Sequence, residues 1–397
     1  MVYVDSLNAT YPTNWKKLKL HDLCKINYGQ SPNRILDQDG IYPVVGTSGT
    51  TRKGKDYFID GETVIIGRKG SIDKPNYYNE KIWVIDTAFF TSDHKNLDCR
   101  WLYYYLDNSK LSRLNESTGV PSLSRATLYN LELLCPPIFE QQKISEILST
   151  WDRAIEQVQR LIEAKQRQKK GLMQGLLTGR LRFPEFGEPV NREEDMPIGW
   201  QKFRLRELVA FYNGFGFPEL NQGKSYGEIP FIKVSDMLNP GNHKYIFSSN
   251  NYVSSNTMET KGWKTAPTSS IVFAKVGEAL YKNRRRILAQ DTILDNNMMA
   301  IKAIPTRIAD LYLYYIMLLV DFSKIAFPGA LPSVNQKELG NEQIMLPGLP
   351  EQRKIISVLD RADTEIDLIN NTLALLRQQK KGLMQKLLTG EIRVKVD

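Results

Sequence analysis

The chain has 397 residues, of which 42% are hydrophobic and 24% charged, a composition that indicates a globular protein, excludes a disordered one and allows two to three domains. Its 53 lysines and arginines exceed its 44 acidic residues, so the net charge of +9 makes a polyanion such as nucleic acid a candidate partner. The three cysteines, Cys24, Cys99 and Cys135, form no CxxC pair, which argues against a disulfide framework or a zinc site and fits a reducing cytoplasm.

The N-terminal segment and the apolar runs of the sequence predict neither a signal peptide nor a membrane span. No basic segment followed by an apolar run opens the chain, so we expect no signal peptide. The longest apolar stretch, near residues 311–320, is too short to span a bilayer. We therefore expect a cytoplasmic protein.

The sequence repeats itself once. The Pro12-x-x-Trp15 segment returns 185 residues later as Pro197-x-x-Trp200, and from Glu140 onward matching residues are a constant 211 apart. Across residues 140–179, 18 of 40 positions are identical to their partners in 351–390. This pattern predicts five segments. They are a variable block at 1–138, a near-identical block at 139–180, a linker with prolines and acidic residues at 181–195, a second variable block at 196–349 and its near-identical block at 350–391.

The variable blocks are predicted to be mixed and rich in strands. Runs of β-branched and aromatic residues between turn residues predict strands near 42–45, 62–66, 81–85 and 270–273. Two apolar runs, 102–106 and 311–319, predict buried helices. Within the blocks, residues 67–70 face 274–277, and Pro121-Ser122 faces Pro332-Ser333.

The two near-identical blocks are predicted to be long helices. Each begins just after a proline (Pro137 or Pro350) and ends at a glycine, and each keeps apolar residues at alternating spacings of four and three for about five heptads. Lysines interrupt this seam, and one glycine lies inside each helix (Gly171 and Gly382), so we expect these places to be weak unless another group supports them. The predicted seam residues are Ile144, Leu148, Trp151, Ile155, Val158, Ile162, Leu172 and Leu176, and Ile355, Leu359, Ala362, Ile366, Ile369, Leu373, Leu376, Leu383 and Leu387.

These helices are expected to pair antiparallel. Forty residues make a helix of roughly 60 Å, whereas a compact block of this size has a diameter of about 40 Å and can hardly return the chain along that whole length. The expected fold is therefore α+β, with two mixed, strand-rich domains at opposite ends of an antiparallel two-helix coiled coil and an internal pseudo-two-fold repeat.

No motif for a catalytic or metal site is apparent. His21, His94 and His243 are scattered, and no HExxH motif is present. The sequence contains neither an (Asn/Asp)-Pro-Pro-(Tyr/Phe) methyltransferase motif nor a carboxylate cluster typical of a nuclease. We therefore predict no catalytic residue, no metal ligand and no cofactor in this chain.

Basic and polar residues of the variable blocks are the candidate nucleic-acid contacts. Arginines grip phosphate or read guanine edges, while lysines mostly neutralise phosphate. For each of them the alternative interpretation is a solvated charged face. The candidates are Arg34, Thr47, Ser48, Arg68, Lys69 and Ser71 in the first block, and Lys233, Ser235, Lys275, Lys282, Arg284, Arg285 and Arg286 in the second.

Taken together, these patterns resemble the specificity subunit of Type I restriction-modification systems. The motifs that carry the resemblance are Pro-x-x-Trp at each block start, the segments 42–49 and 231–236, the Glu-Gln-x-Lys-Ile opening of each helix and its Gly-Leu-Met-Gln-x-Leu-Leu-Thr-Gly ending. The resemblance extends over essentially the whole chain.

The resemblance implies a function and a set of partners. The variable blocks would be target recognition domains, each reading one half of a split sequence in double-stranded DNA. The helices would set the spacing and dock two methyltransferase subunits, and restriction-translocase subunits would join through these. S-adenosylmethionine, ATP and magnesium would belong to the partners, and this chain would be non-catalytic alone.

Two other functions are less consistent with the sequence. A scaffolding protein with a coiled-coil rod would explain the heptads but not two basic mixed blocks. A stand-alone enzyme would require a catalytic cluster that the sequence does not show.

Overall fold

A computed structural model describes residues 11–192, 195–327 and 331–395. The chain divides into unit 1 (Met1–Leu161 and Ile369–Asp397) and unit 2 (Ile162–Leu368). Each unit therefore contains one variable block together with part of both long helices. The predicted absence of a signal peptide concerns a segment that lies largely outside the described residues.

In unit 1, the variable block is built on three groups of strands. A four-stranded sheet has the order β2-β8-β5-β6, a three-stranded sheet has the order β4-β3-β7, and β1 pairs with β9. All pairings are antiparallel except that of β3 with β7. The strands are β1 (Lys16–Lys19), β2 (Lys25–Tyr28), β3 (Tyr42–Gly46), β4 (Gly49–Gly54), β5 (Glu62–Gly67), β6 (Asn76–Asn79), β7 (Trp83–Val84), β8 (Ala88–Ser92) and β9 (Glu132–Cys135).

In unit 2, the second block repeats this plan. The order β11-β18-β15 corresponds to β2-β8-β5, the group β14-β12-β17 corresponds to β4-β3-β7, and the pair β10-β19 corresponds to β1-β9. The copy differs at one edge, where β16 and then β13 follow β15. The strands are β10 (Gln201–Arg204), β11 (Val209–Asn213), β12 (Ile229–Ile232), β13 (Tyr245–Ile246), β14 (Tyr252–Val253), β15 (Ile271–Ala274), β16 (Arg286–Leu288), β17 (Ile293–Leu294), β18 (Met298–Ala303) and β19 (Gln343–Leu346).

The helices include the two that were predicted within the variable blocks. The run 102–106 lies in α2, and the run 311–319 lies in α7, so both predictions are confirmed. The α-helices are α1 (Leu20–Leu23), α2 (Cys99–Asn108), α3 (Arg125–Tyr129), α4 (Ile138–Thr178), α5 (Ser255–Lys261), α6 (Glu278–Tyr281), α7 (Asp310–Leu319), α8 (Gln336–Asn341) and α9 (Leu349–Thr389). The short 3-10 helices are η1 (Leu111–Leu114), η2 (Pro184–Phe186), η3 (Leu205–Glu207), η4 (Glu219–Asn221), η5 (Val234–Leu238) and η6 (Phe322–Lys324).

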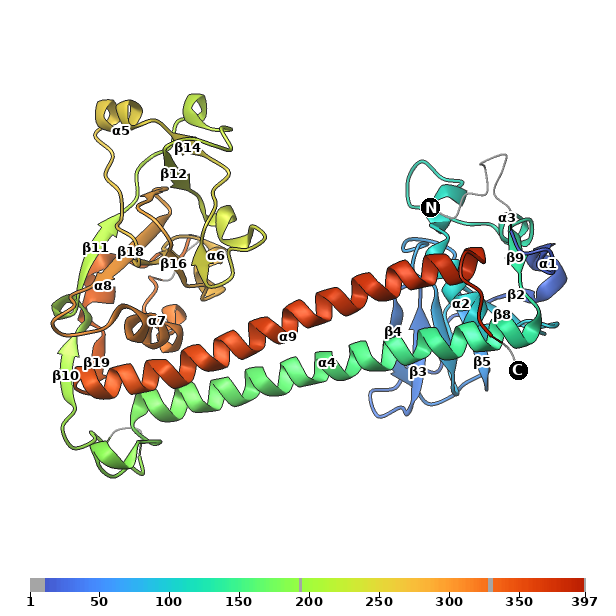
Figure 1. The fold of residues 1–397 in the computed structure, drawn as a ribbon, viewed down its shortest axis with the longest axis horizontal. Helices are drawn as coiled ribbons and strands as arrows, with labels where there is room; N and C mark the ends of the chain where they lie inside the picture. The colour runs from blue at the N-terminus through green and yellow to red at the C-terminus, as the bar shows by residue number, and fades with distance from the viewer. Residues whose placement is uncertain (1–10, 193–194, 328–330, 396–397) are drawn as a thin grey trace. The chain divides into compact units, whose positions relative to one another are not determined.

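The long helices α4 and α9 each have 41 residues. Within each unit they lie side by side and run in opposite directions (Figure 1). In unit 1, Asp152 of α4 pairs with Lys380 of α9, and in unit 2 Lys169 pairs with Asp363, so the predicted antiparallel pairing is confirmed within each unit. One detail differs from the prediction, because α9 begins at Leu349 and Pro350 occupies its first turn. Proline is tolerated there since that N–H has no partner within the helix.

The core of each block extends into both long helices. In unit 1, Leu148 of α4 and Leu387 of α9 belong to the same apolar cluster as Trp101 and Leu102 of α2. In unit 2, Leu176 and Leu359 join the cluster around α7. The helices therefore complete each core, which explains why each unit consists of a block and helix segments. None of the described helices is long and apolar enough to cross a membrane.

Candidate nucleic-acid interface

The repeated motifs meet at one junction in each unit. In unit 1, the indole of Trp15 donates to Glu140 (Nε1 to Oε2, 3.1 Å), and Arg393 binds the same carboxylate through Nε and Nη2 at 2.6 and 2.9 Å. Gly390 lies against Pro12, and a Cβ on this glycine would be 2.6 Å from the proline ring. The Pro-x-x-Trp motif, the Glu-Gln motif and the end of the other helix therefore form one contact.

Unit 2 repeats this junction with the equivalent residues. Trp200 donates to Glu351 at 3.2 Å, and Arg182 binds that carboxylate at 2.9 and 3.0 Å. The side chains of Arg182 and Glu351 are 3% and 5% exposed, so this pair is desolvated. Arg182 lies in the segment 181–195 that the sequence predicted to be a linker. The repeated pattern of an arginine three residues after each helix-ending glycine was the signal that could have identified it.

The lysines that interrupt the predicted seam are held by an aspartate and a tyrosine. In unit 1, Lys380 donates to Asp152 (Nζ to Oδ1, 2.5 Å), and Tyr104 of α2 donates to the other oxygen at 2.6 Å. In unit 2, Lys169 pairs with Asp363, to which Tyr315 of α7 donates at 2.8 Å. A block helix is thus linked to both long helices at the same place in each unit, and we call these groups the Tyr–Asp–Lys anchors.

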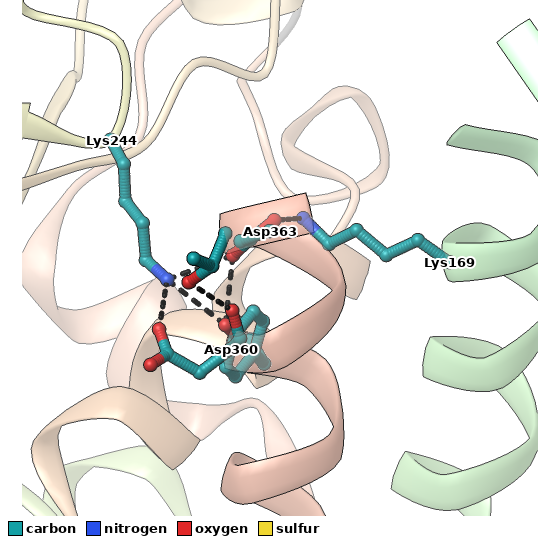
Figure 2. Close-up of polar contacts among 6 residues, drawn as sticks. Lys169, Lys244, Asp360 and Asp363 are labelled. Atoms are coloured by element: carbon teal, nitrogen blue, oxygen red, sulfur yellow. Dashed lines mark hydrogen bonds and ion pairs between the residues drawn. The ribbon is translucent and has the colours of Figure 1, made fainter. Parts of the chain in front are cut away.

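The anchor of unit 2 carries an additional pair. The ammonium of Lys244 donates to Asp360 and to Asp363, both at 2.8 Å, so that Asp363 lies between two lysines (Figure 2). Burial opposes the charge of Lys244, but the two carboxylates outweigh it and raise the pKa of this lysine. Burial likewise would raise the pKa of Asp363, yet hydrogen bonds from Lys169 and Lys244 lower it. Both groups are therefore charged at neutral pH.

The predicted seam residues lie on the covered side of the helices, none being exposed. Those nearest the blocks are buried because they join the block cores, whereas those in the central stretch are mostly half-buried. The buried members are Ile144, Leu148, Ile162, Leu176, Ile355, Leu359, Leu373 and Leu387, and the half-buried members are Trp151, Ile155, Val158, Leu172, Ala362, Ile366, Ile369, Leu376 and Leu383.

In the first block, three side chains converge where β2 and β5 end. Tyr28 ends β2 and Arg68 follows β5, and both strands pair with β8, so the two residues reach the same edge of the sheet. The guanidinium of Arg68 lies over the Tyr28 ring at 5.1 Å from its centroid, and that of Arg125 at 5.2 Å. Arg68 also donates to the carbonyl of Asp86 at 3.1 Å. We call Tyr28, Arg68 and Arg125 the first cluster.

Other candidates of the first block lie near this edge or apart from it. Ser48 donates to Ser71 at 3.1 Å, which joins the loop after β3 to the loop after β5. Thr47 is half-buried, and Lys69 is exposed. Arg34 is exposed, and no contact brings it to the first cluster among the described residues.

In the second block, polar side chains converge at the corresponding edge. Lys275, which follows β15, donates to Asn213 at the end of β11 (Nζ to Oδ1, 3.2 Å). Asn213 in turn donates to Gln336 at the start of α8 (Nδ2 to Oε1, 3.4 Å). Burial lowers the pKa of Lys275. We call Asn213, Lys275 and Gln336 the second cluster.

The basic run 284–286 does not form the surface that the sequence predicted. Arg285 is 1% exposed, its guanidinium carbon lies 3.6 Å from the centroid of the Phe322 ring, and it donates to the carbonyl of Val320 at 2.9 Å. Its assignment as a DNA contact was therefore wrong, because tertiary packing turns this one side chain inward. Arg286 is half-buried and donates to the carbonyl of Asn242 at 2.7 Å, whereas Arg284 is half-buried and Lys282 exposed.

The candidates at β12 organise a loop. Lys233 is half-buried and donates to Gln222 at 2.7 Å, with Phe217 5.9 Å from its ammonium. Asp236 is buried and accepts the backbone N–H groups of Lys233 and Asn250. Ser235 between them is exposed.

Four members of the two clusters escaped the sequence analysis: Tyr28, Arg125, Asn213 and Gln336. The spacing of 185 between the two Pro-x-x-Trp motifs also places Tyr28 opposite Asn213, and the spacing of 211 between Pro121-Ser122 and Pro332-Ser333 places Arg125 opposite Gln336. Among the described residues, no group of three or more His, Cys, Asp or Glu side chains is placed to hold a metal ion. The three cysteine thiols are buried.

Comparisons with known proteins agree with the doubled architecture. A family model described as "Type I restriction modification DNA specificity domain" matches residues 12–166 and 197–378, one match for each copy. The chain is 23% identical to the Type I restriction enzyme MjaVIII specificity subunit of Methanocaldococcus jannaschii, covering 97% of this chain and 94% of the relative. It is also 23% identical to the EcoDI specificity subunit of Escherichia coli, covering 96% and 89%.

Solved structures show the same fold. The S subunit of a Type I restriction-modification system from M. genitalium superposes with a TM-score of 0.62 at 15% identity, covering 98% of both chains. A chain from a study of complex assembly and conformational transition of the Type I system gives a TM-score of 0.59 at 16% identity, covering 97% of this chain and 100% of that one.

Proposed function

Since the chain belongs to the family of Type I restriction-modification DNA specificity proteins, we propose that its two variable blocks each read one half of a split target in double-stranded DNA. The observation that carries this proposal is the duplication of both the block and its exposed cluster. The first cluster lies at one edge of the sheet β2-β8-β5 in the first block, and the second cluster lies at the equivalent edge of the sheet β11-β18-β15 in the second block. Two equivalent reading surfaces in one chain suit a target that has two parts.

The long helices are proposed to set the gap between the two half-sites and to dock two methyltransferase subunits. Each helix has 41 residues, which at about 1.5 Å per residue is roughly 60 Å of continuous helix. Such a helix fixes a length far better than a loop does. Inserting one heptad at equivalent places in α4 and α9 should therefore change the number of unread base pairs and leave both half-sites as they are.

The chain is proposed to be non-catalytic by itself. S-adenosylmethionine, ATP and magnesium would be bound by the methyltransferase and restriction subunits with which it assembles. Purified chain should therefore show no methyltransferase, nuclease or ATPase turnover, and turnover that persists through further purification would contradict this.

The test is to express the chain with its methyltransferase subunits and to map the modified bases across the genome of the host cell. We expect two short sequences separated by a constant number of unread base pairs. A continuous target would contradict the split-target proposal, as would a heptad insertion that changed a half-site but not the gap.

A further inference from the structure

The loops that carry the two clusters make the same backbone hydrogen bonds in both blocks. In the first block, the N–H of Leu123 donates to the carbonyl of Arg68 at 2.9 Å, and Gly70 donates to Pro121 at 2.8 Å. In the second block, Val334 donates to Lys275 at 2.9 Å, and Gly277 donates to Pro332 at 2.8 Å. The same loop-to-strand contacts therefore place Arg125 beside Arg68 and Gln336 beside Lys275.

The side chains at these equivalent positions are all different. Tyrosine, arginine and arginine in the first cluster are replaced by asparagine, lysine and glutamine in the second. The junctions and the anchors, by contrast, use identical residues in both units. Two domains that read different half-sites require different side chains at equivalent backbone positions, as found here.

Only part of the first cluster packs into the fold, through the ring contact of Tyr28 with Phe89 and the hydrogen bond from Arg68 to the carbonyl of Asp86. Tyr28 is nevertheless 45% exposed, and two guanidinium groups lie over its ring. Among the described residues, no carboxylate lies within 4.0 Å of the guanidinium of Arg68 or Arg125. The ring face attracts each guanidinium, but the two like charges repel each other, so an electron-rich partner that binds between them would stabilise the arrangement further.

A second shared feature lies in the same loops. Val120 precedes Pro121 and is 65% exposed, and Leu331 precedes Pro332 and is 67% exposed. The two residues are 211 positions apart, and Leu331 lies 3.7 Å from where a Cβ on Gly277 would be. An aliphatic side chain beside polar groups matches the major groove, where the methyl group of thymine lies next to base-edge donors and acceptors.

We propose that these two clusters are the specificity-determining residues, with Arg68 and Arg125 of the first reading guanine and Asn213 and Gln336 of the second reading adenine. This inference rests on the proposed function, since it names the residues by which each block reads its half-site. A guanidinium donates to O6 and N7 of guanine, while a side-chain amide both donates to N7 and accepts from N6 of adenine.

The test is to map modified bases in cells that express each variant with the methyltransferase subunits. Arg125→Ala should relax the first half-site at one guanine, by roughly 5- to 150-fold in preference, and leave the second half-site unchanged. Gln336→Ala should relax the second half-site at one adenine only. Arg52→Ala, an exposed arginine on β4 in the other sheet of the first block, is the matched control and should leave both half-sites unchanged.

Binding measurements distinguish base reading from a grip on phosphate. With a duplex that carries the wild-type target, Arg125→Lys keeps the charge but loses the paired donors, so it should relax the guanine preference while the salt dependence of binding stays the same. Equal weakening on all sequences, with a log–log salt slope reduced by about 0.9 in Arg125→Ala, would show a phosphate contact and overturn the inference.

A triple substitution tests whether a new base preference can be introduced into the first block. Tyr28→Asn, Arg68→Lys and Arg125→Gln give the first block the side chains of the second, and the guanine preference should shift toward adenine at that position. If the mapped half-sites stay unchanged in this variant and in the single variants, the clusters do not read bases. If the wild-type complex itself modifies no split target, the proposed function fails instead.

Discussion

The two units retain one set of residues and differ in another. Their junctions and anchors are identical, with Trp15, Glu140 and Arg393 in unit 1 repeated as Trp200, Glu351 and Arg182 in unit 2. Their exposed clusters share no residue. The difference teaches that the residues that hold a block to the helices are separate from those that form its exposed cluster. A block can therefore change what it binds without changing how it is held.

The equivalent junctions are nevertheless not equally buried. Arg393 is 43% exposed while it holds Glu140, whereas Arg182 is 3% exposed while it holds Glu351. The anchors differ in the same direction. Asp363 forms ion pairs with two lysines and is 14% exposed, whereas Asp152 forms an ion pair with one lysine and is 42% exposed. Unit 2 should therefore depend more strongly on its buried charges than unit 1.

Exchange of whole blocks should have the largest effect. Replacing residues 1–138 by 196–349 places the second block on the first junction, where Trp200 takes the place of Trp15 beside Glu140 and Arg393. The hybrid should modify targets whose two half-sites carry the same sequence, which mapping of modified bases would reveal. A hybrid that retained the original first half-site would contradict the proposal that the residues attaching a block to the helices are separate from those that read DNA.

Removal of the junction carboxylates should have the next largest effect. Glu351→Gln leaves the buried guanidinium of Arg182 without its counter-charge, which costs roughly 3–5 kcal/mol of unfolding free energy. Glu140→Gln should cost less, since Arg393 can turn to solvent. Urea unfolding of both variants measures the contrast, and equal losses would show that the difference in burial does not matter.

The sequence predicted the repeat, the long helices and the block helices because these depend on spacing and identity along the chain. Ile144 and Leu359, for example, were predicted from heptad spacing to lie on the covered side, and both are buried there in the block cores. Arg285 and Arg182 were misjudged, since burial of a single arginine depends on residues far away in sequence. Arg285 stood in a basic run and Arg182 inside the predicted linker, and both contexts normally indicate exposure to solvent. The contact between Tyr28 and Arg125 likewise could not be predicted from the sequence, because the folded sheet brings these distant residues together.

Neutralising the anchor aspartates should have a smaller effect. Asp363→Asn leaves Lys169 and Lys244 with a weaker acceptor and should cost about 2–3 kcal/mol, since hydrogen bonds to charged groups are of that size. Asp152→Asn should cost about 1 kcal/mol because its carboxylate is partly exposed. Asp360→Asn is the matched control, because Asp360 is 46% exposed and Lys244 keeps its bond to Asp363.

The smallest expected effect is a pH dependence that belongs to unit 2. The pKa of Asp363 is lowered below its ordinary value of 3.8, with burial opposing and the bonds from Lys169 and Lys244 producing the decrease. A carboxylate of lowered pKa stabilises the fold above the pKa of the unfolded chain, and this stability disappears as the pH falls through the folded value.

The unfolding free energies of the wild-type chain and of Asp363→Asn should therefore differ by a constant amount from pH 7 down to about pH 5. Below pH 3.8 the gap should narrow, by at most about 1.4 kcal/mol for each pH unit, since one proton is involved. Urea titrations between pH 3 and pH 7 measure the gap. A gap that stayed constant down to pH 3 would show that the two lysines do not hold Asp363 in its charged form.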